Sequence, residues 1–316
     1  MLLQTNIPFK KETYHPITYD ANVCLLGSCF SEHMGGKLSY YKFKTLQNPF
    51  GILFHPKAIE HIILRAINEE EFTSDAIFYA NERWHCFEAH SALSNADKDI
   101  VLSNLNTALK KTLQTLREAS HIIITLGTAW TYRHIETDTT VANCHKVRQK
   151  KFLKELLSVD EVSASIDNCV ALLKSINPNI TTIFTVSPVR HLKDGFVENQ
   201  QSKAHLLAGI HQVVDIRNQI HYFPSYELMM DELRDYRFYA EDMIHPNALA
   251  IQYIWEKFSH AWISHESEKT MQEIETIQKG LLHKPFNPNS EAHQQFLANL
   301  QAKIAQLQQQ FPEIAF

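Results

Sequence analysis

A serine near the start of the chain and an Asp-x-x-His segment near its end supply three side chains suited to acyl transfer. Ser28 follows an apolar run, residues 23–26, that is typical of a buried strand. Asp242 precedes His245 by three residues, and Pro246 disfavours helical geometry at His245, so one loop can direct both groups the same way. A serine becomes nucleophilic when an imidazole removes its proton and a carboxylate holds that imidazole. These residues predict a catalytic triad of Ser28, Asp242 and His245.

The two residues of the turn compete for the role of nucleophile. Ser28 is also a good helix N-cap, and that role is compatible with catalysis because the positive end of a helix beginning near Cys29 favours a developing alkoxide. Cys29 is the rival, since a thiolate is a stronger nucleophile than a hydroxyl. Consecutive residues on a turn point in different directions. Only one of the two is therefore expected to face a cleft, and the other packs in the core.

The elements that must position these side chains alternate between strand and helix. Apolar, β-branched runs predict strands at residues 22–26, 121–126, 180–186 and 219–223, with a weaker candidate at 41–46. Helical periodicity lies between them, at residues 55–67, 97–118, 158–176 and 198–214. This alternation predicts an α/β domain with a mainly parallel sheet covered on both faces. Ser28 then lies at the carboxyl end of a strand, where such sheets collect ligands.

Two insertions and a C-terminal segment interrupt this alternation. Residues 78–87 are expected to form a hairpin, and residues 131–152 a long polar, irregular loop of functional character. After residue 264 the composition becomes rich in Glu and Gln, with helices expected at residues 265–282 and 290–310. We therefore expect a main domain, residues 1–264, and a C-terminal helical hairpin, residues 265–316. The hairpin is amphipathic enough to pack on the main domain or on a second copy in a homo-oligomer.

A family resemblance adds to this interpretation. Gly-Ser-Cys-Phe-Ser at residues 27–31 resembles the signature of the GSCFA family, which is similar to the SGNH (GDSL-like) hydrolases, and the Asp-x-x-His pair resembles the last SGNH sequence block. Further family-like stretches are residues 48–51, 126–130, 143–146, 187–190 and 234–239. The resemblance implies a three-layer SGNH-like (flavodoxin-like) fold and a serine esterase that hydrolyses O-acyl groups, acetyl above all, of a carbohydrate-type or other small-molecule ester. It also implies that Ser28, not Cys29, faces the cleft.

The oxyanion hole departs from the common SGNH pattern. Backbone amides of Ser28 and Gly51 are the expected donors. Where SGNH enzymes carry Gly-x-Asn after a central strand, residues 127–129 are Gly-Thr-Ala, so the side-chain amide is missing. Asn143, on the long loop, is the expected replacement, and Asn48 is the alternative. This gap also supports a first alternative function, a non-catalytic SGNH-like module that binds a glycan or an acyl chain.

Substrate contacts and metal ligands follow from the same segments. Trp130, His145 and Arg190 are expected to bind substrate because of their places in the family-like stretches. The 18 histidines contain no helical ligand pair. A metal-assisted hydrolase, with ligands drawn from residues such as 85, 88 and 90, is thus a second alternative, and we expect neither metal nor cofactor.

Composition limits the remaining classes of function. A formal charge of −5 gives no global attraction to nucleic acid, and the basic run at residues 146–151 is typical of a solvated loop. Five cysteines without a Cys-x-x-Cys pair indicate neither a disulfide framework nor a thiolate zinc site. No apolar run is long enough to span a bilayer, and the first residues lack a secretory pattern. We therefore expect a cytoplasmic protein with no nucleic-acid or membrane partner.

Overall fold

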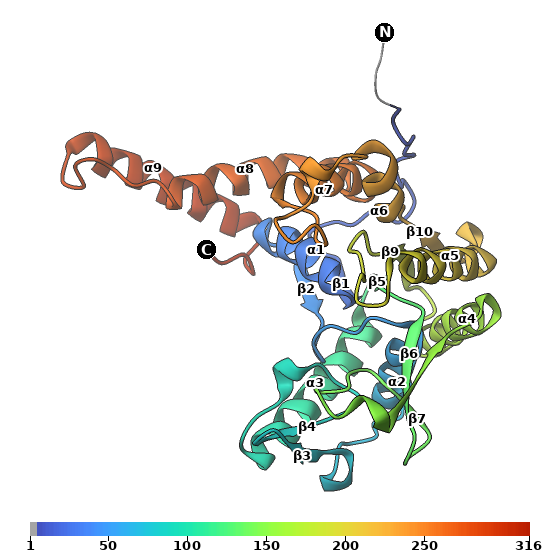
Figure 1. Ribbon diagram of the computed structural model, residues 1–316. Coiled ribbons are helices and arrows are strands. Elements are labelled where there is room, and N and C mark those ends of the chain that lie inside the picture. Colours follow the sequence, from blue (N-terminus) through green and yellow to red (C-terminus); the bar gives the residue numbers. More distant parts are fainter. Residues whose placement is uncertain (1–4) are drawn as a thin grey trace.

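A five-stranded parallel sheet forms the centre of the molecule, whose computed structural model describes residues 5–316 (Figure 1). Its order is β10-β9-β5-β1-β2, and every neighbouring pair is parallel. The strands are β1 (Asn22–Gly27), β2 (Lys44–Gln47), β5 (His121–Leu126), β9 (Thr181–Val186) and β10 (Ile220–Tyr222). Numbered along the chain, this is the 2-1-3-4-5 order of flavodoxin-like folds, in which ligands bind where the order reverses, between the first and third strands. That place lies at the carboxyl ends of β1 and β5.

The sheet is covered on both faces, as the continuous apolar character of its central strands requires. Along β1, Cys24 and Leu26 enter the core under one helical layer, while Val23 and Leu25 enter the core under the other. The first layer consists of α2 (Pro56–Ile67), α3 (Lys98–Glu118), α4 (Val159–Ile176) and α5 (Phe196–Val213). The second consists of α1 (Cys29–Tyr40) and α7 (Ala248–Trp262). The α/β fold class with a mainly parallel sheet is thus confirmed.

The two insertions are both β structure. β3 (Phe78–Ala80) and β4 (Arg83–His85) form the expected hairpin. The expectation of an irregular loop at residues 131–152 is wrong, because β6 (Trp130–His134) pairs antiparallel with β7 (Thr139–Val141) and with β8 (Phe152–Leu156). These strands are largely half-buried or exposed, so their sequence lacks the apolar alternation by which a strand is recognised. Shorter helical turns are η1 (Ser74–Ala76), η2 (Ser91–Leu93), η3 (Gln149–Lys151), η4 (Ile216–Asn218), α6 (Ser225–Glu227), η5 (Leu228–Glu232) and η6 (Tyr236–Phe238).

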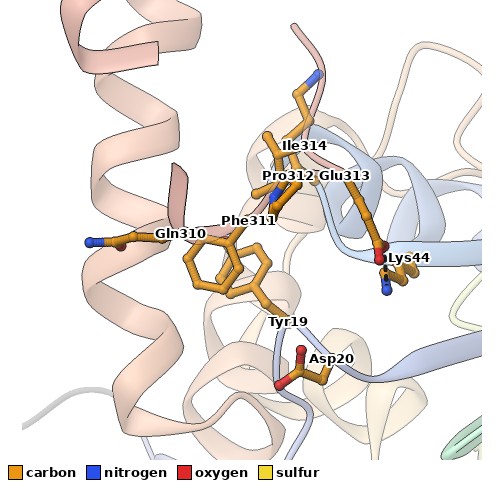
Figure 2. A pocket seen from close by; sticks show the side chains of 9 residues that line it. Tyr19, Asp20, Lys44, Gln310, Phe311, Pro312, Glu313 and Ile314 are labelled. Atoms are coloured by element: carbon orange, nitrogen blue, oxygen red, sulfur yellow. Dashed lines mark ion pairs between the residues drawn. The ribbon is translucent and has the colours of Figure 1, made fainter. Parts of the chain in front are cut away.

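The C-terminal helices α8 (His265–Leu281) and α9 (Glu291–Gln310) form a hairpin that extends from the α7 side of the molecule (Figure 1). After α9 the chain returns to the main layer, where Phe311 lies against Tyr19 with ring centroids 5.1 Å apart (Figure 2). Glu313 forms an ion pair with Lys44 at the start of β2, and Ile314 is buried. A small cavity of about 100 Å³ remains beneath this tail.

The first described residues also join the C-terminal half. The Ile17 amide donates to the Trp262 carbonyl at 2.7 Å, and Ile17 pairs with Ile263 in a parallel bridge. Within residues 5–316, every helix is too short or too polar to cross a membrane.

Candidate active site

The turn between β1 and α1 is fixed by its glycine and by a hydrogen bond to the neighbouring strand. Gly27 has a φ of 135°, and a Cβ there would lie 2.1 Å from the Thr125 carbonyl oxygen. A side chain at this position would therefore clash with the backbone of β5. The amide of Ser28 donates to that same carbonyl at 3.0 Å. The chain is thus held against β5 at the point where α1 begins.

Ser28 caps α1 and is fully buried. Its hydroxyl oxygen accepts a hydrogen bond from the Phe30 amide at 3.3 Å, and its exposed fraction is 0%. Cys29 is half-buried instead, and it lines a cavity of about 590 Å³ that His245 also lines. Ser28, the nucleophile expected from the sequence, thus lies behind the cavity wall, and Cys29 lies at the wall. The N-cap geometry turns the hydroxyl toward the first amides of its own helix, which leaves the next residue at the cavity wall.

His245 reaches the cavity from the loop before α7, and Asp242 fixes its imidazole. Oδ2 of Asp242 lies 2.6 Å from Nδ1 of His245, and Oδ1 accepts the amides of Ile244 and His245 at 2.9 and 3.0 Å. These bonds to His245 and Ile244 lower the pKa of the Asp242 carboxyl to about 2. Between the two residues Met243 adopts a left-handed φ of 57°, which closes the turn. Because the carboxylate holds Nδ1, the nitrogen left for proton transfer is Nε2.

The two backbone amides expected in an oxyanion hole already have acceptors. The Ser28 amide bonds to Thr125, as described above, and the Gly51 amide donates to the Asn48 carbonyl at 2.7 Å. Gly51 has a φ of 72°, and a Cβ there would lie 2.4 Å from the Cβ of His90, so the turn requires glycine. In this structure both amides thus close turns of the backbone.

Asn48 carries an unpaired side-chain amide next to the β1–α1 turn. Its Oδ1 accepts the Gly27 amide at 2.9 Å, while its buried Nδ2 has no hydrogen-bond partner within residues 5–316. Asn143 lines the cavity, but its Oδ1 closes a local turn by accepting the His145 amide at 2.8 Å. A buried NH₂ group without an acceptor is costly unless a ligand supplies one. Asn48 thus has the unpaired donor, and Asn143 has the place at the cavity wall.

Of the three residues expected to bind substrate, two line the cavity and one lies behind it. Trp130 and Arg190 both line the cavity. His145 is buried outside it, with Nε2 donating to the Cys86 carbonyl at 2.7 Å, and burial lowers the pKa of His145 to about 4. The ring of His145 thus packs in the core beneath the loop and not at the cavity wall.

The histidines and carboxylates do not assemble a metal centre in the described part of the chain. No group of three His, Cys, Asp or Glu side chains within residues 5–316 is arranged to hold an ion. Glu88, one of the suggested ligands, instead pairs with Arg65 at 2.7 Å and with His61 at 2.9 Å.

Comparison with known proteins places the chain in a family. Residues 22–258 match the sequence model of the GSCFA family. The chain belongs to the GSCFA family. Residues 274–316 match a second model, described as the C-terminal domain of GSCFA domain proteins. No curated protein matches the sequence.

Solved structures similar to this GSCFA chain include a carbohydrate esterase family 3 protein from Talaromyces cellulolyticus. The two share 9% sequence identity with a TM-score of 0.35, over 81% of this chain and 99% of that one. A likeness this distant carries no information on substrate or mechanism.

One polar residue near the GSCFA site, Lys203, is not expected from the sequence. Lys203 of α5 is 1% exposed, and its Nζ donates to the carbonyls of Gly127 and Ser187 at 2.8 and 2.7 Å. His191 lines the cavity, and its Nε2 has no hydrogen-bond partner within residues 5–316. Lys203 lies three residues before Leu206 on the buried stripe of α5, and a lysine on such a stripe is the signal that would have revealed it.

Proposed function

We propose that this GSCFA protein is a carboxylic ester hydrolase of SGNH type in which Cys29 is the nucleophile, His245 the general base and Asp242 the group that orients the imidazole. The observation that carries the proposal is that Cys29 and His245 line one cavity while Asp242 holds Nδ1 of His245. We assign the nucleophile to Cys29 and not to Ser28, the residue expected from the sequence, because Ser28 is buried as the N-cap of α1.

The proposed reaction has two acyl transfers. The Cys29 thiol gives its proton to Nε2 of His245, and its sulfur bonds to the ester carbonyl carbon. The bond to the alcohol oxygen then breaks, the alcohol takes the proton from His245, and a thioester on Cys29 remains. Water gives a proton to His245 and attacks the thioester. The carbon–sulfur bond breaks, the acid leaves, and the thiol regains its proton.

The oxyanion of each tetrahedral intermediate needs donors near Cys29. Nδ2 of Asn48 is a buried donor without an acceptor beside this turn. The amides of Phe30 and Ser31 already bond to Ser28, so the first turn of α1 contributes mainly the positive potential of the helix dipole. These groups supply the function that Gly-Thr-Ala at residues 127–129 cannot supply.

The substrate class follows from the resemblance and the cavity together. The proposed substrates are O-acyl esters of a carbohydrate-type alcohol, and acetyl is the first acyl group to test. Trp130 and Tyr132 in the cavity wall provide aromatic faces of the kind that pack on sugar rings. Arg190, at the same wall, can donate hydrogen bonds to a polar alcohol moiety.

The experiment is hydrolysis of p-nitrophenyl acetate and of an acetylated oligosaccharide by the wild type and three variants. Cys29→Ala is expected to remove nearly all turnover. Cys144→Ala, which changes another cysteine of the same cavity, is the matched control and is expected to retain it. Ser28→Ala is expected to retain turnover but to lower the free energy of unfolding by about 1 kcal/mol through loss of the N-cap. Turnover that survives in Cys29→Ala but not in Ser28→Ala would return the nucleophile to Ser28, and no hydrolysis of any ester would support the non-catalytic binding module.

A further inference from the structure

We propose that Lys203 is the counter-ion of a Cys29 thiolate, and thus a positioning residue that acts on the nucleophile from behind the cavity. The inference deepens the proposed function and rests on it, since a thiolate matters there as the attacking group. It is carried by the place of Lys203 in the sheet, by the hydrogen bonds of its ammonium group and by the charges around it.

Lys203 reaches the carboxyl end of the sheet from α5. Its Nζ bonds at 2.8 Å to the carbonyl of Gly127, which directly follows β5, and at 2.7 Å to the carbonyl of Ser187, which directly follows β9. Cys29 follows β1, the strand on the other side of β5. The ammonium group and the thiol therefore lie at the ends of neighbouring strands, at the position where this sheet order collects ligands.

Burial of an ammonium group at this position costs free energy. Lys203 is 1% exposed, and it forms no ion pair with a carboxylate within residues 5–316. Burial lowers the pKa of Lys203 to about 7, and Cys29 acts against that decrease. A buried charge is tolerated when an opposite charge compensates it. The thiolate of Cys29 is the anion that this site can provide.

A residue that only attached α5 to the loop after β5 would not need a positive charge. Ser202, the preceding residue of α5, holds the same loop with neutral hydrogen bonds, to the hydroxyl of Thr128 at 3.0 Å and to the amide of Ala129 at 2.7 Å. The two carbonyl acceptors of Lys203 also account for only two of the three ammonium protons. What distinguishes Lys203 from its neighbour is its positive charge, and Nζ is held at the ends of β5 and β9, 5.7 Å from the centre of the Tyr226 ring.

The charges around Cys29 come from several elements. Burial raises the pKa of the Cys29 thiol and Glu32 of α1 adds to the increase, whereas Lys203 and the first amides of α1 lower it. His191 and His245 face the same region. Burial lowers the pKa of His191 to about 3, and the charges of Lys203 and His245 add to the decrease. His191 is thus neutral at physiological pH. Lys203 is then the cation that opposes Glu32.

The test measures the reactivity of Cys29 without any ester substrate. Iodoacetamide alkylation is followed between pH 6 and 10 by mass spectrometry of the peptides that contain Cys29 and Cys144, in the full-length wild type, Lys203→Gln and Ser202→Ala. Gln can still donate to both carbonyls but carries no charge. We expect alkylation of Cys29 in Lys203→Gln at pH 6.5, where Lys203 of the wild type is below its pKa of about 7 and charged, to be at least about tenfold slower than in the wild type, which corresponds to one pKa unit. We expect Ser202→Ala to match the wild type.

The wild type contains an internal control. Cys144 lines the same cavity, and burial raises its pKa to about 11 with no cation opposing the increase. We expect the alkylation midpoint of Cys29 to lie below that of Cys144, so this comparison decides the question if Lys203→Gln does not fold. Equal alkylation of Cys29 in Lys203→Gln and wild type, or a wild-type midpoint of Cys29 at or above that of Cys144, would overturn the proposal. Failure of the ester-hydrolase proposal is seen separately, as ester turnover that persists in Cys29→Ala.

Discussion

The carboxylate of Asp242 holds Nδ1 of His245 at 2.6 Å while the same carboxylate accepts two amides of its own loop. The imidazole therefore cannot rotate without breaking the turn that carries it. Asp242→Asn replaces the acceptor at Nδ1 with a group that can present an N–H, which favours the wrong tautomer. We expect kcat for ester hydrolysis to fall at least about a hundredfold with little change in KM.

A matched control for this variant lies seven residues earlier. Asp235 also accepts a local amide, that of Arg237 at 2.8 Å, but it does not line the cavity. Asp235→Asn is expected to keep full turnover. Equal kinetics for the two Asn variants would contradict the role assigned to Asp242.

The oxyanion donor is tested by exchanging one atom of Asn48. Asn48→Asp keeps an oxygen for the Gly27 amide but replaces the unpaired NH₂ with an acceptor. Loss of a side-chain donor of this kind costs on the order of a hundredfold in turnover, roughly 3 kcal/mol of transition-state stabilisation. Asn143→Asp, at the cavity wall, is the control and is expected to lose little. The measurement is kcat of the two variants. Full turnover in Asn48→Asp would mean that backbone amides alone form the oxyanion hole.

Acid stability is expected to depend on His55, the N-cap of α2. Its Nδ1 accepts the Ala58 amide at 3.1 Å, its Nε2 donates to the Val141 carbonyl at 3.1 Å, and burial lowers its pKa to about 4. Between pH 6.5 and 4 the unfolded state therefore binds a proton that the folded state does not, so stability falls as the pH is lowered through this range. The loss expected from this residue is about 3 kcal/mol.

His55→Asn retains an N-cap acceptor and removes the titrating group. Urea unfolding at pH 7 and at pH 4 is expected to show a smaller difference in free energy for this variant than for the wild type. A difference that is unchanged would mean that the other buried histidines account for the acid sensitivity.

The C-terminal tail is expected to stabilise the fold through its apolar contact. Ile314 is buried against the main layer, whereas Gln310 at the same small cavity is exposed. Ile314→Ala should lower the free energy of unfolding by about 2 kcal/mol, the lower end for a buried isoleucine because the site is near the surface. Gln310→Ala should change it by less than about 0.5 kcal/mol. Indistinguishable urea midpoints for the two variants would show that the tail does not stabilise the main layer.

Much of the fold could be predicted because its central elements are uniformly apolar or strictly periodic. Residues 121–126 and 181–186 are buried throughout, so a continuous run was sufficient to identify β5 and β9. The helices of one layer were found at nearly their true bounds because their buried residues recur every three to four positions. The small sheet of β6, β7 and β8 could not be recognised this way, since Thr139 and Thr140 are exposed and no apolar alternation marks the strands.

The site was predicted less completely than the fold, for a reason that lies in the turn itself. Residues and spacing located the β1–α1 turn and the Asp242–His245 loop, and these lie at one cavity wall through Cys29 and His245. The direction of the first residues of α1 determines whether Ser28 or Cys29 faces that cavity. That direction is set by the N-cap of the helix, which the sequence pattern does not specify. Lys203 is 174 positions from Cys29 along the chain. Only the parallel order of β1, β5 and β9 brings their side chains to the same edge.

The bridge between Ile17 and Ile263 has a consequence for biosynthesis. Val23 and Leu25 of β1 belong to a core that α7 helps to enclose, and α7 ends at Trp262. A nascent chain on the ribosome therefore carries an uncovered apolar sheet face until most of its length has been translated, which is the situation in which chaperones bind. Pairing across about 245 residues also gives a high contact order, for which slow folding is expected. Cys29 and His245, the proposed nucleophile and base, meet only when that late step is complete, so we expect truncated chains that end before α7 to be inactive in the ester assay.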